Sequence, residues 1–199
     1  MDDSALKILI IDENRIRASI LEDGLREAGY SRLTVLRSHA FRLADVASAA
    51  PDVIFIDLED PNRDRLENVL HVSRAVERPI AVFADKSDAA MIEAAFESGV
   101  SAYIVDGLRK ERVKPILDIT ISRFNAFKRL KRELDDVKTE LEDRKVVDRA
   151  KGLLMKRKNV TEAEAYALLR RTAMNNNRKI VEVAQSILLA ADLVGGSDE

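Results

Sequence analysis

The sequence predicts an α/β fold class in three parts: a doubly wound five-stranded parallel sheet, a coiled-coil helix, and an all-α domain of three helices. Three observations lead to this prediction. Short β-branched runs alternate with segments of helical period over residues 1–122. Residues 116–151 contain neither Pro nor Gly, and three amphipathic stripes occupy the C-terminal part. We therefore place a first domain at 1–122, a linker helix at 123–142 and a second domain at 143–199.

The strands of the first domain are near-continuous apolar runs. Strands of this kind are buried on both faces, as in a parallel sheet that helices cover on each side. Right-handed crossovers between them give a doubly wound fold, here with five strands and five helices. The expected strands are 7–12, 33–36, 52–57, 79–84 and 102–105, and the helices between them lie near 14–29, 40–49, 63–75 and 87–98.

Three carboxylates follow the strands at one edge of this sheet. Asp12 and Glu13 come after the first strand and Asp57 ends the third. In a doubly wound sheet the ligand site lies at the carboxyl ends of the strands. Converging carboxylates repel each other unless a hard cation such as Mg²⁺ binds them, and an aspartate beside that metal can attack a phosphoryl donor. The alternative is that these are ordinary solvent-facing acids.

This arrangement resembles the receiver domain of response regulators, which has a flavodoxin-like fold. The resemblance places Asp57 at the phosphoacceptor position and Asp12 and Glu13 at the metal-binding pair. It implies Mg²⁺ as the cofactor at these three carboxylates. It also implies a histidine kinase as a possible partner.

Two positions depart from the receiver pattern. Ala84 stands where receivers carry a Thr or Ser whose hydroxyl binds the phosphoryl group, and Asp106 stands where they carry a Lys. A phosphoryl group would lose two contacts and gain a repulsive neighbour. Tyr103 retains the aromatic switch position without its usual hydroxyl partner. We therefore expect a pseudo-receiver that works without phosphorylation.

A long helix is expected between the two domains. Pro115 suits the first turn of a helix that continues to Lys158. Apolar residues then alternate at spacings of three and four, the a and d positions of about two heptads. This pattern favours a parallel coiled coil that joins two copies of the chain; the alternative is a helix that folds back on its own receiver. The apolar residues are Phe127, Leu130, Leu134, Val137 and Leu141.

The C-terminal domain is marked by a capping box. Thr161 is followed three residues later by Glu164, so that side chain and backbone can bond reciprocally at the start of a helix. Apolar stripes at helical spacing lie before this helix, along it, and after a polar break at residues 175–177. Three such stripes can enclose one small core.

The same region is strongly basic. Residues 144–179 hold eleven Lys or Arg against three acids, whereas the whole chain has a net charge of −2. A basic face on a compact helical unit attracts phosphates, and counterion release makes nucleic acid a natural partner. The alternative is a solvated helix surface.

The order of residues in this region resembles the ANTAR domain, a three-helix RNA-binding module of bacterial transcription antiterminators. The match rests on RAKGLLM at 149–155, AY at 165–166, LR at 169–170 and KIVEVA at 179–184, and it covers about Asp143 to Val194. The resemblance implies a leader RNA with two neighbouring stem-loops that carry hexanucleotide loops. Binding would stabilise these against an overlapping terminator, so that RNA polymerase reads through.

Candidate RNA contacts combine cations for phosphates with one aromatic ring for an unpaired base. Small residues beside them would allow close approach of RNA or of a helix. Two alternatives stay open: Tyr166 can pack in the three-helix core, and Gly152 can simply ease a helix crossing. The candidates are Arg149, Ala150, Lys151, Gly152, Lys156, Tyr166, Arg170 and Lys179.

Within this family the first domain resembles the NasT-type branch, from nitrate and nitrite assimilation. The similar segments are 57–67, 79–88 and 99–115. The resemblance implies control by protein association: a NasS-type nitrate-sensor protein sequesters the antiterminator and releases it when nitrate or nitrite binds.

Other function classes find little support. The chain has no Cys, which excludes a metal site with thiolate ligands. Its two His, His39 and His71, lie far apart in the sequence, so catalysis by imidazole groups finds little support. We expect no enzyme activity. With no signal peptide and no long apolar run, we expect a cytoplasmic protein. The alternatives of a different class are a DNA-binding or phosphorylation-dependent two-component response regulator and a phosphotransfer scaffold.

Overall fold

The computed structural model describes residues 5–38, 41–58 and 63–195, so that His39 lies outside the described residues. The chain divides into two compact units, Met1–Lys128 and Arg129–Glu199, which we describe separately. Among the described residues, no helix has the length and apolar character needed to cross a membrane.

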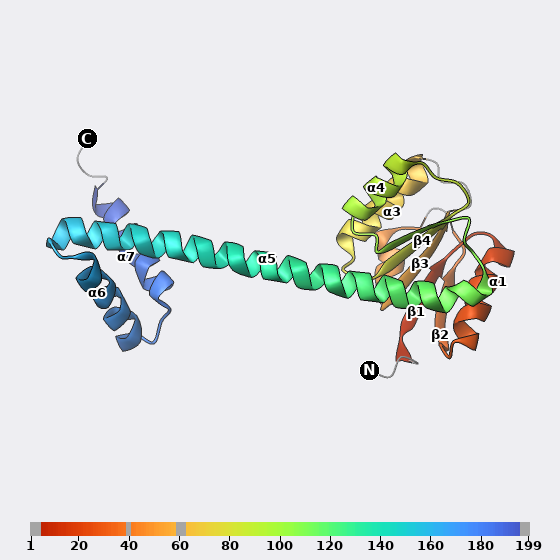
Figure 1. Cartoon of the computed structure of the whole chain (residues 1–199), viewed down its shortest axis with the longest axis horizontal. Helices are drawn as coiled ribbons and strands as arrows, with labels where there is room; N and C mark the ends of the chain where they lie inside the picture. The colour runs from red at the N-terminus through yellow and green to blue at the C-terminus, as the bar shows by residue number, and fades with distance from the viewer. Residues whose placement is uncertain (1–4, 39–40, 59–62, 196–199) are drawn as a thin grey trace. The chain divides into compact units, whose positions relative to one another are not determined.

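The first unit is a five-stranded, all-parallel sheet in the order β2-β1-β3-β4-β5. The expected doubly wound fold is thus confirmed (Figure 1). The strands are β1 (Lys7–Ile11), β2 (Arg32–Leu36), β3 (Val53–Leu58), β4 (Ile80–Ala84) and β5 (Ala102–Val105), and the helices between them are α1 (Arg15–Glu27), α2 (Leu43–Ala49), α3 (Arg63–Ala75) and α4 (Ala89–Glu97).

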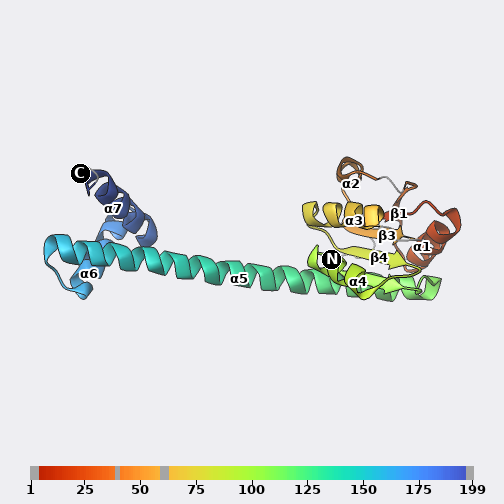
Figure 2. The same ribbon diagram turned by 90° about the horizontal axis from the view of Figure 1, so that it is seen from above.

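Each face of the sheet carries its own hydrophobic core, because successive strand residues point to opposite faces. In β1, Leu9 and Ile11 belong to a core with α2, α3 and α4, whereas Ile8 and Ile10 belong to a core with α1 and the start of α5. Figure 2 shows α2 and α3 on one side of the strands and the start of α5 on the other. This two-sided burial is the reason that the strands read as continuous apolar runs.

Helix α5 (Lys110–Lys158) begins earlier than the sequence predicted. Pro115 lies inside the helix and not in its first turn, so the expectation that Pro115 starts the helix is wrong. The helix is held at its start by packing on α1. A Cβ on Gly24 would lie 2.8 Å from Cβ of Val113 and 2.8 Å from the carbonyl oxygen of Lys110, so only glycine permits this approach.

The apolar seam of α5 is exposed in the single chain. Each of its five side chains is more than half exposed, although they recur at the spacing of a coiled coil. They are Phe127, Leu130, Leu134, Val137 and Leu141.

The second unit consists of the end of α5 with α6 (Glu162–Asn175) and α7 (Ile180–Gly195). The predicted capping box is confirmed, since the Thr161 hydroxyl accepts from the Glu164 amide and the Glu164 carboxylate accepts from the Thr161 amide. One small core joins the three helices, as the three stripes predicted. Its fully packed members are Ala150, Leu154, Ala165, Leu169, Ala173, Val183 and Ala184.

Candidate functional site

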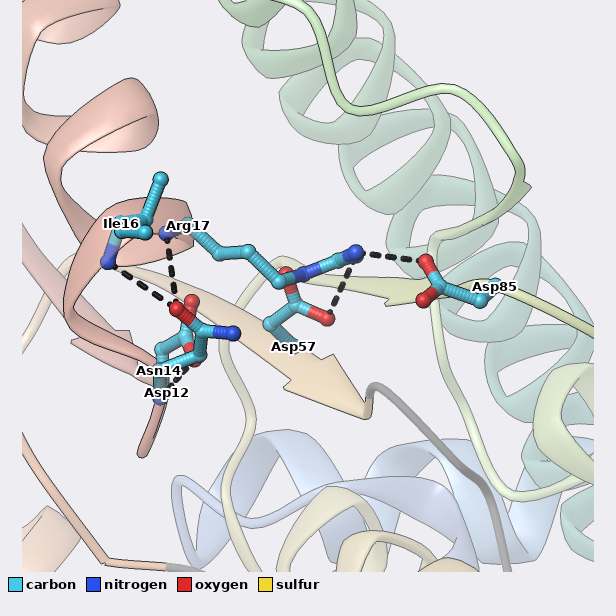
Figure 3. Close-up of polar contacts among 6 residues, drawn as sticks. All are labelled: Asp12, Asn14, Ile16, Arg17, Asp57 and Asp85. Carbon is cyan, nitrogen blue, oxygen red and sulfur yellow. Dashed lines mark hydrogen bonds and ion pairs between the residues drawn. The ribbon is translucent and has the colours of Figure 1, made fainter.

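The receiver-like unit places Asp57 at the carboxyl end of β3, where its side chain has no solvent exposure. An arginine that the sequence analysis did not single out reaches it from the first turn of α1. Arg17 Nε donates to Asp57 Oδ2 at 2.6 Å and Nη2 donates to Asp57 Oδ1 at 2.9 Å (Figure 3). Both oxygens of the expected phosphoacceptor are therefore held by one guanidinium in bidentate geometry.

The same guanidinium reaches a second carboxylate. Arg17 Nη1 donates to Asp85 Oδ1 at 2.6 Å, and Asp85 directly follows β4. We call Arg17, Asp57 and Asp85 the arginine clamp. Burial lowers the pKa of Arg17, but hydrogen bonds and charge attraction from Asp57 and then Asp85 outweigh it, so the net pKa is raised. The arginine of the clamp is therefore a permanent cation.

The turn between β1 and α1 aims Arg17 at this edge. The side chain of Asn14 caps α1 by accepting from the amides of Ile16 and Arg17, at 3.0 and 3.4 Å. Asp12 Oδ1 in turn accepts from the Asn14 amide at 2.8 Å. A first-turn residue of α1 therefore lies at the carboxyl edge of the sheet. A basic residue one turn after the strand-end acids was the signal that could have found it.

The predicted Mg²⁺ ligands do not form a metal site as they are arranged here. Asp12 is buried, Glu13 is exposed, and both oxygens of Asp57 accept from Arg17. Within the described ranges, no three His, Cys, Asp or Glu side chains are grouped so that they could hold a metal. Asp12, Glu13 and Asp57 thus do not fit a divalent cation in this arrangement.

The other receiver positions depart from the pattern in the way the sequence suggested. Ala84 ends β4 without a hydroxyl, and Asp106 is exposed after β5 with a φ of 48°. The usual hydroxyl partner of Tyr103 is absent, as predicted, because position 84 is alanine. A different residue bonds to the ring hydroxyl: Ser87 Oγ donates to Tyr103 Oη at 3.1 Å from the segment after β4.

In the second unit, three predicted RNA contacts line one open groove of about 620 Å³. Lys151 comes from α5, Tyr166 from α6, and Lys179 directly precedes α7. Tyr166 is 44% exposed and is not part of the core cluster, so its ring faces the groove and not the core. The groove is also lined by Glu140, Asp143, Arg144, Val147, Asp148, Ile180 and Val181.

Lys151 is less available than the sequence suggested. Its side chain is 16% exposed, and its ammonium lies 2.7 Å from Asp148 Oδ1 and 2.7 Å from Glu162 Oε1. Hydrogen bonds to Asp148 and then to Glu162 raise the pKa of Lys151. This lysine ties the end of α5 to the start of α6.

Apart from Lys151 and Tyr166, the candidates fall into three groups. Four cations are exposed and, within the part of the chain that the structure describes, none of them forms an ion pair. Ala150 is fully buried in the three-helix core, so its side chain cannot meet a ligand directly, which corrects its assignment as a contact. Gly152 is half-buried and has open space where a Cβ would be. The exposed cations are Arg149, Lys156, Arg170 and Lys179.

Comparisons with known proteins agree with this architecture. Residues 135–188 match the model of the ANTAR domain. The transcriptional regulatory protein PdtaR of Mycobacterium tuberculosis is 29% identical over 184 residues, which cover 92% of this chain and 89% of that protein. The nitrate regulatory protein of Klebsiella oxytoca is 32% identical over 75 residues, which cover 38% of this chain and 19% of that protein.

The first unit has a structural counterpart. The signal receiver domain of a modulated diguanylate cyclase from Desulfovibrio desulfuricans superposes with a TM-score of 0.52 at 17% identity, covering 61% of this chain and 97% of that domain. At this identity the likeness shows the receiver fold alone. With that fold followed by a segment that matches the ANTAR domain, the chain is similar in its arrangement to ANTAR-domain regulators of the NasT type.

Proposed function

We propose that this regulator is an RNA-binding transcription antiterminator that acts in the cytoplasm. It binds a leader RNA with paired hexanucleotide-loop stem-loops and prevents formation of an overlapping terminator. The observation that carries the proposal is the groove of the ANTAR domain, where an exposed tyrosine, Tyr166, lies beside Lys179. Sequence-specific RNA recognition generally stacks unpaired loop bases on aromatic side chains.

The charges around the groove favour a base inside it and phosphates outside it. Glu140 and Asp143 line the groove, where their carboxylates can accept hydrogen bonds from base amino groups, whereas Asp148 is already paired with Lys151. Arg149 and Arg170 are exposed and are not among the residues that line it. A splayed loop base in the groove, with its backbone on the exposed cations, satisfies both sets of charges. Duplex DNA offers no unstacked base to this site.

We further propose that protein association, and not phosphorylation, controls the receiver. Ala84 lacks the hydroxyl and Asp106 reverses the charge that a phosphoryl group on Asp57 would need, and Arg17 occupies both Asp57 oxygens. The partner is a NasS-type nitrate sensor, and the genes are those of nitrate or nitrite assimilation. The likeness to the nitrate regulatory protein of Klebsiella oxytoca supports this choice of pathway.

The regulator is proposed to act as a homodimer through α5. The exposed seam from Phe127 to Leu141 repeats at coiled-coil spacing, and a second copy carries the same repeat. Two neighbouring RNA loops also match two ANTAR domains in number. Dimerisation through the seam would cover apolar surface that a single chain leaves in water.

The experiment that tests the RNA proposal uses the full-length chain and three ligands across a salt series. These are a paired-hexaloop leader RNA, an RNA with both loop sequences scrambled, and duplex DNA. We expect tight binding to the first only, with a salt dependence that reports phosphate contacts. Equal weak binding to all three would contradict RNA recognition, and preference for the duplex would favour a DNA-binding regulator.

A further inference from the structure

The arginine clamp places a positive charge where a receiver is expected to bind a metal. Both Asp57 oxygens accept from Arg17, at 2.6 and 2.9 Å, and the Asp57 side chain has no solvent exposure. Figure 3 shows the guanidinium extending over Asp57 towards Asp85. The Asp57 carboxylate is therefore already paired with a cation of the protein itself.

We propose that Arg17 is the resident cation of this receiver: its guanidinium takes the place of a divalent metal on Asp57 and keeps both Mg²⁺ and phosphoryl donors off this carboxylate. The inference deepens the proposal of phosphorylation-independent control by naming the residue responsible. It does not depend on RNA binding.

The chemistry of the carboxylate supports this exclusion. Mg²⁺ requires oxygen ligands at about 2.0–2.1 Å in near-octahedral geometry. A bidentate guanidinium directs an N–H at each oxygen of Asp57, along the directions in which a metal would bind. The same lone pairs would have to attack phosphorus in a phosphoryl transfer. One side chain thus blocks both steps.

The position of Asp12 indicates what would happen without Arg17. Asp12 and Asp57 each follow a paired residue of neighbouring parallel strands, since Ile11 pairs with Ile56. Such neighbours lie about 5 Å apart across a sheet. With the guanidinium removed, the Asp57 carboxylate would lose this cation, and its repulsion from the neighbouring Asp12 carboxylate would be less compensated. A divalent metal would relieve that repulsion.

The test compares full-length wild type with Arg17→Ala and Arg17→Gln by thermal melting with and without saturating Mg²⁺. Arg15→Ala is the matched control, because Arg15 is an exposed neighbour on the same helix. We expect Mg²⁺ to leave the melting temperature of wild type and the control unchanged. It should raise the melting temperature of the Arg17 variants by roughly 5 °C or more, and Asp57→Asn in the Arg17→Gln background should abolish the gain.

Two results would overturn the inference. One is a wild type that responds to Mg²⁺ as strongly as the Arg17 variants, because Arg17 would then not exclude the metal. The other is folded Arg17 variants that do not respond at all. Arg17→Gln keeps a polar side chain, so it serves if Arg17→Ala does not fold.

A second readout separates this inference from the proposed mode of control. Each protein is incubated with acetyl phosphate and Mg²⁺, and its intact mass is measured. Phosphorylation would form a bond between an Asp57 oxygen and phosphorus, break the bond from phosphorus to the acetyl oxygen, and release acetate with the electron pair. Phosphorylation of wild type would end the proposal of phosphorylation-independent control and this inference with it. A failure of the Arg17 variants to bind Mg²⁺ would end this inference alone.

Discussion

The acidic edge of the receiver sheet and the basic surface of the ANTAR domain are both charged, but their side chains meet different partners. Asp57 is buried and paired with Arg17 inside its own unit. Arg149, Arg170 and Lys179 are exposed and form no ion pair among the described residues. Both regions would be identified as charged sites by composition. In the first, the central carboxylate is already paired, whereas in the second the exposed cations are available to bind a partner.

The same contrast divides the ANTAR domain itself. Lys151 and Lys179 line one groove, yet Lys151 is held by Asp148 and Glu162 whereas Lys179 is exposed. A lysine that is already paired gives up one ion pair to form another, so it adds little to binding. Within one groove, Lys151 therefore stabilises the fold, whereas Lys179 is available to bind a ligand.

The largest expected effect concerns the cores on which these sites are built. The receiver has two cores, whereas the ANTAR domain has one small cluster in which four of seven buried members are alanine. Leu169→Ala should therefore lower the free energy of unfolding by about 2–5 kcal/mol. Chemical denaturation followed by circular dichroism measures this. Leu189→Ala, at an exposed position of α7, should change it by less than about 0.5 kcal/mol.

The next effect sharpens the contrast within the arginine clamp. Asp57→Ala removes two hydrogen bonds from a partly buried guanidinium and should cost about 1.5–3 kcal/mol of unfolding free energy. Asp85→Ala removes one bond to a carboxylate that is 44% exposed and should cost less than about 1 kcal/mol. Equal losses in urea denaturation would mean that the bidentate pair is no stronger than the exposed one.

RNA affinity tests whether Tyr166 in the groove of the ANTAR domain contacts a base. Tyr166→Ala should weaken binding to the hexaloop RNA by about 1–3 kcal/mol, or roughly 5- to 150-fold, because the base loses its stacking surface. Tyr166→Phe retains the ring and should bind within a few-fold of wild type. Fluorescence anisotropy with labelled RNA measures both. Similar losses for the two variants would point to the hydroxyl and not to the ring.

Salt dependence distinguishes the two lysines of the groove. Lys179→Ala should reduce the slope of log affinity against log salt by about 0.7–1, as expected for the loss of one phosphate contact. Lys151→Ala should leave the slope nearly unchanged, because its ammonium is paired within the domain. An equal reduction for both would show that RNA displaces the carboxylates from Lys151.

The smallest effect is the pH dependence of the capping box. Hydrogen bonds from the Thr161 amide and hydroxyl lower the pKa of Glu164 below its ordinary value of 4.5. The ionised Glu164 carboxylate therefore contributes fully to the free energy of unfolding above pH 4.5. This contribution is lost as the pH falls through the lower pKa of Glu164 in the folded state. Melting of wild type and Glu164→Gln between about pH 6 and about pH 3 measures this. The melting temperature of the variant should fall less steeply over that range.

The sequence by itself determined most of the secondary structure, the apolar strands and amphipathic helices, and the capping box, but not the start of α5. These depend on neighbours within a few residues: strands with apolar runs, helices with a repeat near four, and Thr161 three residues before Glu164. It also determined the ANTAR motifs and the place of Asp57 at a strand end, since parallel strands bring their carboxyl ends to one edge.

Only the tertiary structure decided which charges are already satisfied. Arg17 meets Asp57 across 40 residues and Asp85 across 68, and Ser87 meets Tyr103 across 16. No local period encodes such pairs, because they form only when the strands and helices that carry them are packed. A sequence lists the charges of a site, whereas packing decides which of them are neutralised within the chain and which are left to bind a ligand.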